Sequence, residues 1–118
     1  MPLADFELES IAGLPVAHFS GEIDRSNAAE LGERVTHAID EGSMGLVADL
    51  SKLAFIDSTG IHMLFALAAE LKRQHQALRV VVPAGAHLGE ILDTVGLNQA
   101  APTDPTVEEA VAALTNGG

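Results

Sequence analysis

The sequence predicts an α/β protein whose mixed β-sheet opens with a hairpin and continues with alternating helices and strands. Residues 6–19 alternate apolar and polar side chains and reverse at Ala12-Gly13, as two antiparallel strands joined by a tight turn do. Beyond the hairpin, apolar residues recur at spacings of three and four or in short continuous runs, which are typical of helices and buried strands. We therefore expect about four helices packed against this mixed sheet.

Each later element is predicted by its own pattern and its own start or stop signal. Apolar residues spaced for one helix face follow Ser26, and a second such stripe follows Ser58. Thr106 and Glu109 form a capping box at the start of a last short helix. We expect helices over residues 26–41, 58–71, 88–95 and from 106 onward, and strands over 46–50 and 78–82.

The length and composition predict one domain over residues 1–118, ordered from about residue 4 to about residue 115. Hydrophobic residues make up 47% of the chain while tryptophan and tyrosine are absent, so the core must be largely aliphatic. The absence of cysteine suits a reducing compartment, and no basic leader or long apolar run occurs. We expect a soluble cytoplasmic protein.

The charge of the chain narrows the classes of partner. The chain has six basic and seventeen acidic residues, which gives a formal net charge of -11. Such a field repels nucleic-acid phosphates and anionic lipid headgroups. We therefore expect neither nucleic acid nor a membrane surface as partner, and we favour a basic protein surface.

The tetrapeptide Asp57-Ser58-Thr59-Gly60 is the most informative motif, because it joins a strand-like approach to an amphipathic helix. Serine and aspartate are favoured helix caps, so simple capping is one interpretation. However, Asp57, Ser58 and Thr59 are three consecutive residues able to cap one helix end. At least one of them is then free for other work.

A phosphate on Ser58 would lie at the positive end of the helix dipole, an arrangement worth about 0.3 to 1 kcal/mol, so the fold would tolerate it. The same group adds about -1.5 to -2 charges beside Asp57 and would change what the surface can bind. A modification that the fold tolerates and a partner rejects is what a binary switch requires. Ser58 is therefore a candidate phosphorylation site.

Three further polar residues are ambiguous in the sequence. Asp24 ends the hairpin and either belongs to a simple turn or shares a rim of the sheet with Asp57. Asp49 interrupts a buried apolar run, and we expect it to be a strand-end residue that bonds to a neighbouring loop. His62 follows Ser58 by one helical turn, where it either faces solvent or partly neutralises a phosphate.

Enzyme classes are disfavoured by the motifs that the chain lacks. It contains no G-x-x-x-x-G-K-[ST] phosphate loop, no G-x-G-x-x-G after the first strand and no G-x-S-x-G around Ser58. The other histidines, without cysteine or paired helical spacing, give no metal site, and we expect no cofactor. A phosphoacceptor aspartate would use acids such as Asp24, Asp49 and Asp57, but the opening hairpin does not fit that doubly wound plan.

Four segments together resemble the STAS-domain anti-sigma factor antagonists. The aspartate-serine-threonine-glycine box, combined with the earlier glycine-glutamate-isoleucine-aspartate, is fairly specific, and the likeness covers nearly the whole chain. The segments are Gly21–Asp24, Val47–Ser51, Phe55–Ile61 and Val95–Leu97.

The resemblance implies that Ser58 is the phosphoacceptor and that Asp24 and Asp57 shape its site. It implies an anti-sigma factor that is also a serine kinase as partner, and a PP2C-type phosphatase that restores the active form. The unmodified protein would bind the anti-sigma factor and free sigma. His62 stands where the family often has a small residue. The partner-binding residues expected on this basis are Asp24, Asp57, Ser58, Thr59, Gly60 and His62.

A second hypothesis is a constitutive STAS scaffold or accessory subunit, for example in a stress-signalling or lipid-transport complex. In that case Ser58 would serve only as a helix cap. The two hypotheses share the fold and differ in whether Ser58 is modified.

Overall fold

A computed structural model describes residues 4–116 and contains one five-stranded sheet. The strands lie in the order β1-β2-β3-β4-β5, with β1 antiparallel to β2 and every other pair parallel. Their bounds are β1 Asp5–Ile11, β2 Leu14–Ile23, β3 Gly45–Ile56, β4 Ala77–Val81 and β5 Thr103–Asp104.

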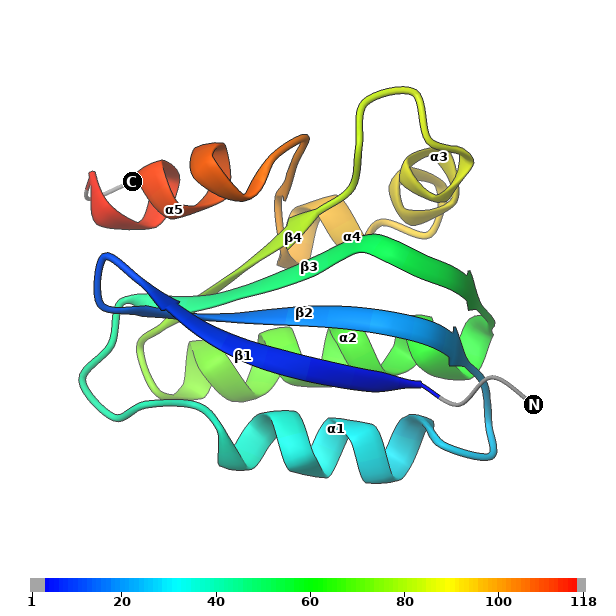
Figure 1. Cartoon of the computed structure of the whole chain (residues 1–118), viewed down its shortest axis with the longest axis horizontal. Coiled ribbons are helices and arrows are strands. Elements are labelled where there is room, and N and C mark those ends of the chain that lie inside the picture. The colour runs from blue at the N-terminus through cyan, green and yellow to red at the C-terminus, as the bar shows by residue number, and fades with distance from the viewer. Residues whose placement is uncertain (1–3, 117–118) are drawn as a thin grey trace.

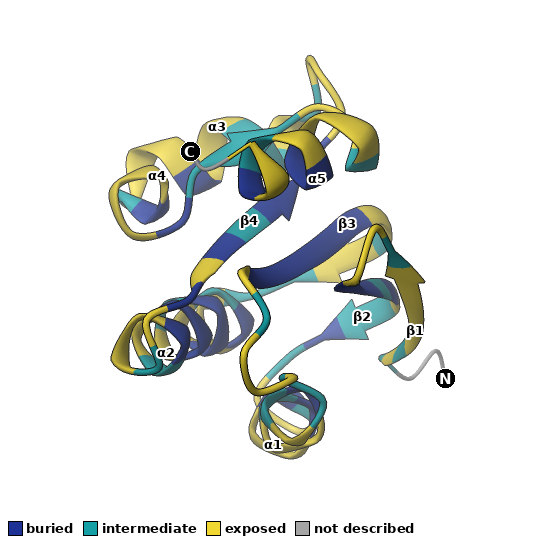
Figure 2. Ribbon diagram, turned by 90° about the vertical axis from the view of Figure 1, so that its left-hand side faces the viewer, coloured by how far each residue is buried: buried dark blue, intermediate teal, exposed yellow. Residues whose placement is uncertain are grey.

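Helices cover both faces of this sheet (Figures 1 and 2). Helices α1 and α2 lie on one face and α5 lies on the other, while α3 and the short α4 follow β4. Their bounds are α1 Ala28–His37, α2 Ser58–Arg73, α3 His87–Thr94, α4 Leu97–Ala100 and α5 Val107–Thr115. No helix among residues 4–116 combines the length and the apolar character needed to cross a bilayer.

Alternating residues of β2 and β3 point to opposite faces of the sheet and pack in two separate hydrophobic cores. Phe19 on β2 and Leu46 on β3 point into the larger core beneath α1 and α2. Val16 on β2 and Val47 on β3 point to the opposite face and pack with Val111 beneath α5. Both faces of β3 are therefore buried over its first half, which is why Leu46–Leu50 reads as a nearly continuous apolar run.

The opening hairpin is confirmed. Ile11 pairs with Leu14, which leaves a two-residue loop, and both loop residues have positive φ, 53° at Ala12 and 80° at Gly13. Two consecutive left-handed residues match the right-handed twist of the flanking strands. Glycine takes this conformation easily, whereas Ala12 takes it at some cost.

Three features differ from the sequence predictions. The structure has five helices where the pattern predicts about four, because residues 97–100 form one short additional turn. It adds the two-residue strand β5, and β3 continues through residues 51–56, which looked like a link. Pairing with β4 stops at Asp49, so beyond that point only β2 flanks β3, and most side chains there are exposed. The polar pair Ser51-Lys52 interrupts the apolar pattern at this point, which makes one continuous strand look like a strand and a link.

The predicted ends of α2, α3 and α5 lie within two residues of the observed ones, whereas α1 is shorter at both ends than the predicted 26–41 and runs from Ala28 to His37. Thr106 caps α5 by accepting a bond from the Glu109 amide, at 3.2 Å, as the capping box predicts. Gly96 is left-handed after α3, with φ 82°. The expected loss of order near the C-terminus concerns Gly117 and Gly118, which lie outside the described residues.

Candidate functional site

Helix α2 begins at Ser58 and is capped by Asp57. The Oδ1 atom of Asp57 accepts hydrogen bonds from the amides of Thr59, at 2.9 Å, and Gly60, at 3.1 Å. Asp57 has extended backbone angles, as N-cap residues do. One carboxylate oxygen thus satisfies two of the amides that a helix start leaves unpaired.

The Ser58 hydroxyl is left without a structural task. Ser58 is exposed, and no hydrogen bond joins its side chain to any residue within 4–116. The sequence predicted more capping groups than the end of α2 needs, and Asp57 alone does the capping. Ser58 therefore offers an unengaged hydroxyl at the positive end of a sixteen-residue helix.

Asp24 lies on the same rim of the sheet as Asp57. The two aspartates directly follow Ile23 and Ile56, which are paired residues of the parallel strands β2 and β3. The Asp57 amide donates to the Ile23 carbonyl at 3.1 Å and so joins the two strand ends. The choice that the sequence left open, between an isolated turn and a shared rim, is resolved in favour of the rim.

Local hydrogen bonds hold the carboxylate of Asp24. Its Oδ1 accepts from both the hydroxyl and the amide of Ser26, the latter at 2.9 Å. These two bonds, the hydroxyl first, lower the pKa of Asp24 below its ordinary value of 3.8. Asp24 is therefore an anion at neutral pH, beside the start of α2.

Asn27 positions this rim, and the sequence analysis did not single it out. Its side-chain amide donates to the Glu22 carbonyl at 2.9 Å, and its side-chain oxygen accepts from the Asp24 amide at 3.0 Å. This side chain therefore ties the end of β2 to the start of α1, together with backbone bonds from the Asn27 and Ala28 amides to the Asp24 carbonyl. An asparagine just before the apolar stripe of α1 was the available signal, because asparagine bonds readily to nearby backbone in turns.

The remaining predicted partner-binding residues divide into surface and interior. Thr59 and His62 are exposed on the first turns of α2. Gly60 is buried, and a Cβ there would stand 2.5 Å from Cγ1 of Ile56 and 2.8 Å from Cγ2 of Ile23. Gly60 thus allows α2 to approach the strand ends closely, so its expected place on the binding surface is corrected to a packing role beneath it.

Asp49 belongs to a different polar cluster, on the face of the sheet that α5 covers. Its Oδ2 lies 2.7 Å from Nδ1 of His18, and Nε2 of the same ring lies 2.7 Å from Oε1 of Glu9. Its Oδ1 accepts from the Ser51 amide at 3.0 Å. The expectation of a strand-end residue bonded to a loop is wrong, because β3 continues to Ile56 and Asp49 bonds to the adjacent strand β2 and within β3.

This cluster links three adjacent strands through one imidazole. Both ring nitrogens of His18 lie beside carboxylates, and an ionised carboxylate can only accept hydrogen bonds, so this geometry favours the imidazolium form of the ring. Burial disfavours that charge, but the bonds to Asp49 and Glu9 outweigh it and raise the pKa of His18 above 6.5. Burial likewise opposes ionisation of Asp49, and the bonds from Ser51 and His18 reverse its effect and lower the pKa of that carboxyl.

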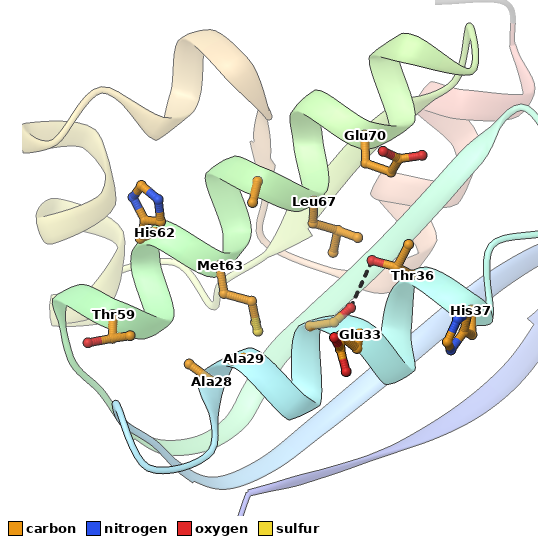
Figure 3. A pocket seen from close by; sticks show the side chains of 12 residues that line it. Ala28, Ala29, Glu33, Thr36, His37, Thr59, His62, Met63, Leu67 and Glu70 are labelled. Carbon is orange, nitrogen blue, oxygen red and sulfur yellow. Dashed lines mark hydrogen bonds between the residues drawn. The ribbon is translucent and has the colours of Figure 1, made fainter.

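A groove between α1 and α2 opens beside the rim (Figure 3). It has a volume of about 570 Å³, and Thr59 and His62 line the end nearest Ser58. Within residues 4–116, no three His, Asp or Glu side chains are arranged to hold a metal ion. The site on the rim therefore consists of an unengaged hydroxyl, two carboxylates and an adjoining groove.

Known proteins are similar to this chain over nearly its whole length. The Bordetella bronchiseptica protein BtrV, named as an anti-sigma factor antagonist, is 28% identical over 107 residues, 91% of each chain. The structure of an anti-sigma factor antagonist from Mycobacterium paratuberculosis is 27% identical, has a TM-score of 0.83 and aligns over 96% of this chain and 95% of that one.

The Bacillus cell fate determinant SpoIIAA in its phosphorylated form shares the fold, with a TM-score of 0.65, 20% identity and coverage of 93% of this chain and 99% of that one. The family model of the STAS domain matches residues 5–110, which include every strand and the first turn of α5. This chain belongs to the STAS domain family.

Proposed function

We propose that this protein is an anti-sigma factor antagonist that works by partner switching. Its unphosphorylated form binds an anti-sigma factor that is also a serine kinase, and sigma is released. The kinase phosphorylates Ser58, which ends the binding, and a PP2C-type phosphatase restores the active form. The protein itself acts as a binding module rather than an enzyme.

The observation that carries this proposal is the unengaged hydroxyl of Ser58. A serine that capped α2 would be tied to the backbone, and modifying it would unravel the helix start. Here Asp57 holds the cap and Ser58 is exposed, so a kinase can reach the hydroxyl without disturbing a bond that the fold needs. Relatives that are named as anti-sigma factor antagonists support the same role.

The charges around Ser58 support a switch that acts on the partner and not on the fold. A phosphate at the start of α2 gains about 0.3 to 1 kcal/mol from the helix dipole. The same phosphate adds about two negative charges beside Asp57, on a rim that Asp24 already makes negative. Like charges brought together at an interface cost several kcal/mol, so a partner that accepts the hydroxyl would reject the phosphate.

The test compares the affinities of Ser58→Ala and Ser58→Asp for the cognate anti-sigma factor by calorimetry. We expect Ser58→Ala to bind as the unmodified protein does and Ser58→Asp to bind at least about tenfold more weakly, which corresponds to about 1.4 kcal/mol. The matched control is Ser10→Asp, which adds the same charge at an exposed serine near the hairpin turn, at the other end of β2. Equal affinities for the two Ser58 variants contradict the proposal.

Measuring the intact mass of the protein after incubation with the kinase distinguishes the switch from the alternative, a constitutive STAS scaffold. Incubation with the kinase and ATP should add one phosphate to the wild-type chain and none to Ser58→Ala. A folded wild-type sample that gains no phosphate would favour the scaffold, in which Ser58 is an ordinary surface residue.

A further inference from the structure

The groove between α1 and α2 is built from small side chains over a buried apolar floor. Where the helices approach, α1 contributes Ala28, Ala29 and Gly32 and α2 contributes Ala66, so little side-chain volume fills the space between them. Met63 and Leu67 form the floor and are only 7% and 3% exposed (Figure 3).

The groove is elongated and begins at the rim. Both helices start at the ends of the paired strands β2 and β3, and lining residues run along α2 from Thr59 to Glu70. The eleven residue-to-residue steps from Thr59 to Glu70, at a rise of about 1.5 Å each, give a length of about 16 Å, or about three helical turns. An elongated apolar groove of this length suits an amphipathic helix, which lays its apolar face along such a surface.

The charges of the groove are of one sign. Glu33 and Glu70 lie on its two sides, and none of the residues that line it is lysine or arginine. The Glu70 carboxylate is already ion-paired with the guanidinium of Arg73 at 2.6 Å, whereas no hydrogen bond or ion pair joins the Glu33 side chain to any residue within 4–116. Together with the formal net charge of -11, these carboxylates disfavour a second copy of this chain and favour a cationic occupant.

We propose that this groove binds a basic amphipathic helix of the same anti-sigma factor that the rim at Ser58 recognises. The inference rests on the proposed function and adds a second, continuous contact: apolar side chains of the partner helix meet Met63 and Leu67, and its lysines or arginines meet Glu33. His62 lies four residues after Ser58 and lines the groove. It therefore lies between the phosphorylation site and the rest of the groove, where a partner bound to both would contact it.

Two alanines of α2 give a matched test. Ala66 and Ala69 are both exposed on the same helix, but only Ala66 lines the groove. Ala66→Arg fills the groove with bulk and with the charge that repels a basic helix, while Ala69→Arg adds the same side chain outside it. With the anti-sigma factor as titrant, we expect Ala66→Arg to weaken binding at least about tenfold and Ala69→Arg to change it less than about twofold.

Charge reversal tests the chemistry of the occupant. Glu33→Lys should weaken binding several-fold at low salt, and the difference from wild type should shrink as NaCl is raised, because salt screens exposed charges. Circular dichroism establishes that each variant is folded. A salt-independent effect of Glu33→Lys would overturn the basic character of the partner helix.

Failure of the groove and failure of the proposed function give different results. If Ser58→Asp loses binding while Ala66→Arg binds as wild type, the switch stands and the groove proposal is overturned. If Ala66→Arg and Ala69→Arg lose the same affinity, the loss comes from the change in total charge and not from the groove, and the groove proposal is overturned as well. If the two Ser58 variants bind equally, or the wild-type chain does not bind at all, the proposed function fails and the groove proposal falls with it.

Discussion

Two groups of carboxylates on the same sheet use their oxygens differently. On the rim, Asp24 and Asp57 each accept two hydrogen bonds on one oxygen, Oδ1, and within residues 4–116 the second oxygen of each accepts none. On the face covered by α5, Asp49 uses both oxygens, one for the Ser51 amide and one for the ring of His18.

The difference separates charge that holds the fold from charge that is available at the surface. An amide could replace either rim carboxylate and still supply the one oxygen that is used. In the cluster around Asp49, both carboxylate oxygens are needed. Asp49 is 6% exposed, and the ring of His18 depends on its charge. We infer that the rim aspartates serve recognition and that Asp49 serves stability.

The largest effect that tests this comparison is expected from Asp49→Asn. The amide offers one acceptor where the carboxylate offers two, so it turns its NH₂ group toward either the Ser51 amide or the His18 ring, both of which are donors. Losing a charged hydrogen bond in a buried place costs about 2 kcal/mol. Urea denaturation should show this loss in the free energy of unfolding.

The matched control on the rim is Asp24→Asn. Its single used oxygen is retained, and we expect the free energy of unfolding to change by less than about 0.5 kcal/mol, as for other surface substitutions. Equal losses in Asp24→Asn and Asp49→Asn would break the distinction between the two groups.

A smaller effect is expected at Asp57, where alanine and asparagine separate the cap from the charge. Asp57→Ala removes the acceptor of two amides and should lower the free energy of unfolding by about 1 kcal/mol, while Asp57→Asn keeps the cap and should change it little. Affinity for the anti-sigma factor then reports on the charge alone. A loss of stability in Asp57→Asn as large as that in Asp57→Ala would contradict the assignment of Asp57 to recognition.

Much of the fold could be predicted because local patterns and tertiary environment agree. The hairpin turn at Ala12-Gly13, the start of α2 and the capping box at Thr106 each depend on a few adjacent residues. The outer half of β3 and strand β5 could not be predicted, since their existence depends on which strands flank them and not on their own side chains.

The candidate site was predictable in part for the same reason. That one capping residue at α2 would be spare followed from the sequence, but which one required the geometry of Asp57. The linkage of Glu9, His18 and Asp49 joins residues nine and thirty-one positions apart through strand register. The groove between α1 and α2 likewise depends on the packing of two helices, which no local motif specifies.

The smallest effect concerns the pH dependence of stability, which should carry the signature of the His18 cluster. All the charged groups that face the ring are acidic: Glu7 opposite it on β1, Glu9 and Asp49 in contact, and Glu108 across the adjoining cavity. The pKa of His18 is raised above 6.5, so its contribution is complete below about pH 6.5 and is lost as pH rises through the folded-state value. The pKa of Asp49 is lowered below 3.8, so its contribution is present above about pH 4 and is lost as pH falls through its folded-state value.

The difference in unfolding free energy between wild type and His18→Gln, measured by urea titration from pH 4 to 9, isolates this contribution. It should be greatest between about pH 4 and 6.5 and decline on the alkaline side, because glutamine carries no proton to lose. The amplitude should be modest, since 32% of the His18 side chain is exposed and solvent screens its charge. The rim should cause no decline in stability at alkaline pH, because Asp24 has a lowered pKa and changes its charge only at acidic pH. A difference that stays constant from pH 5 to 9 would show that His18 is not held as an imidazolium.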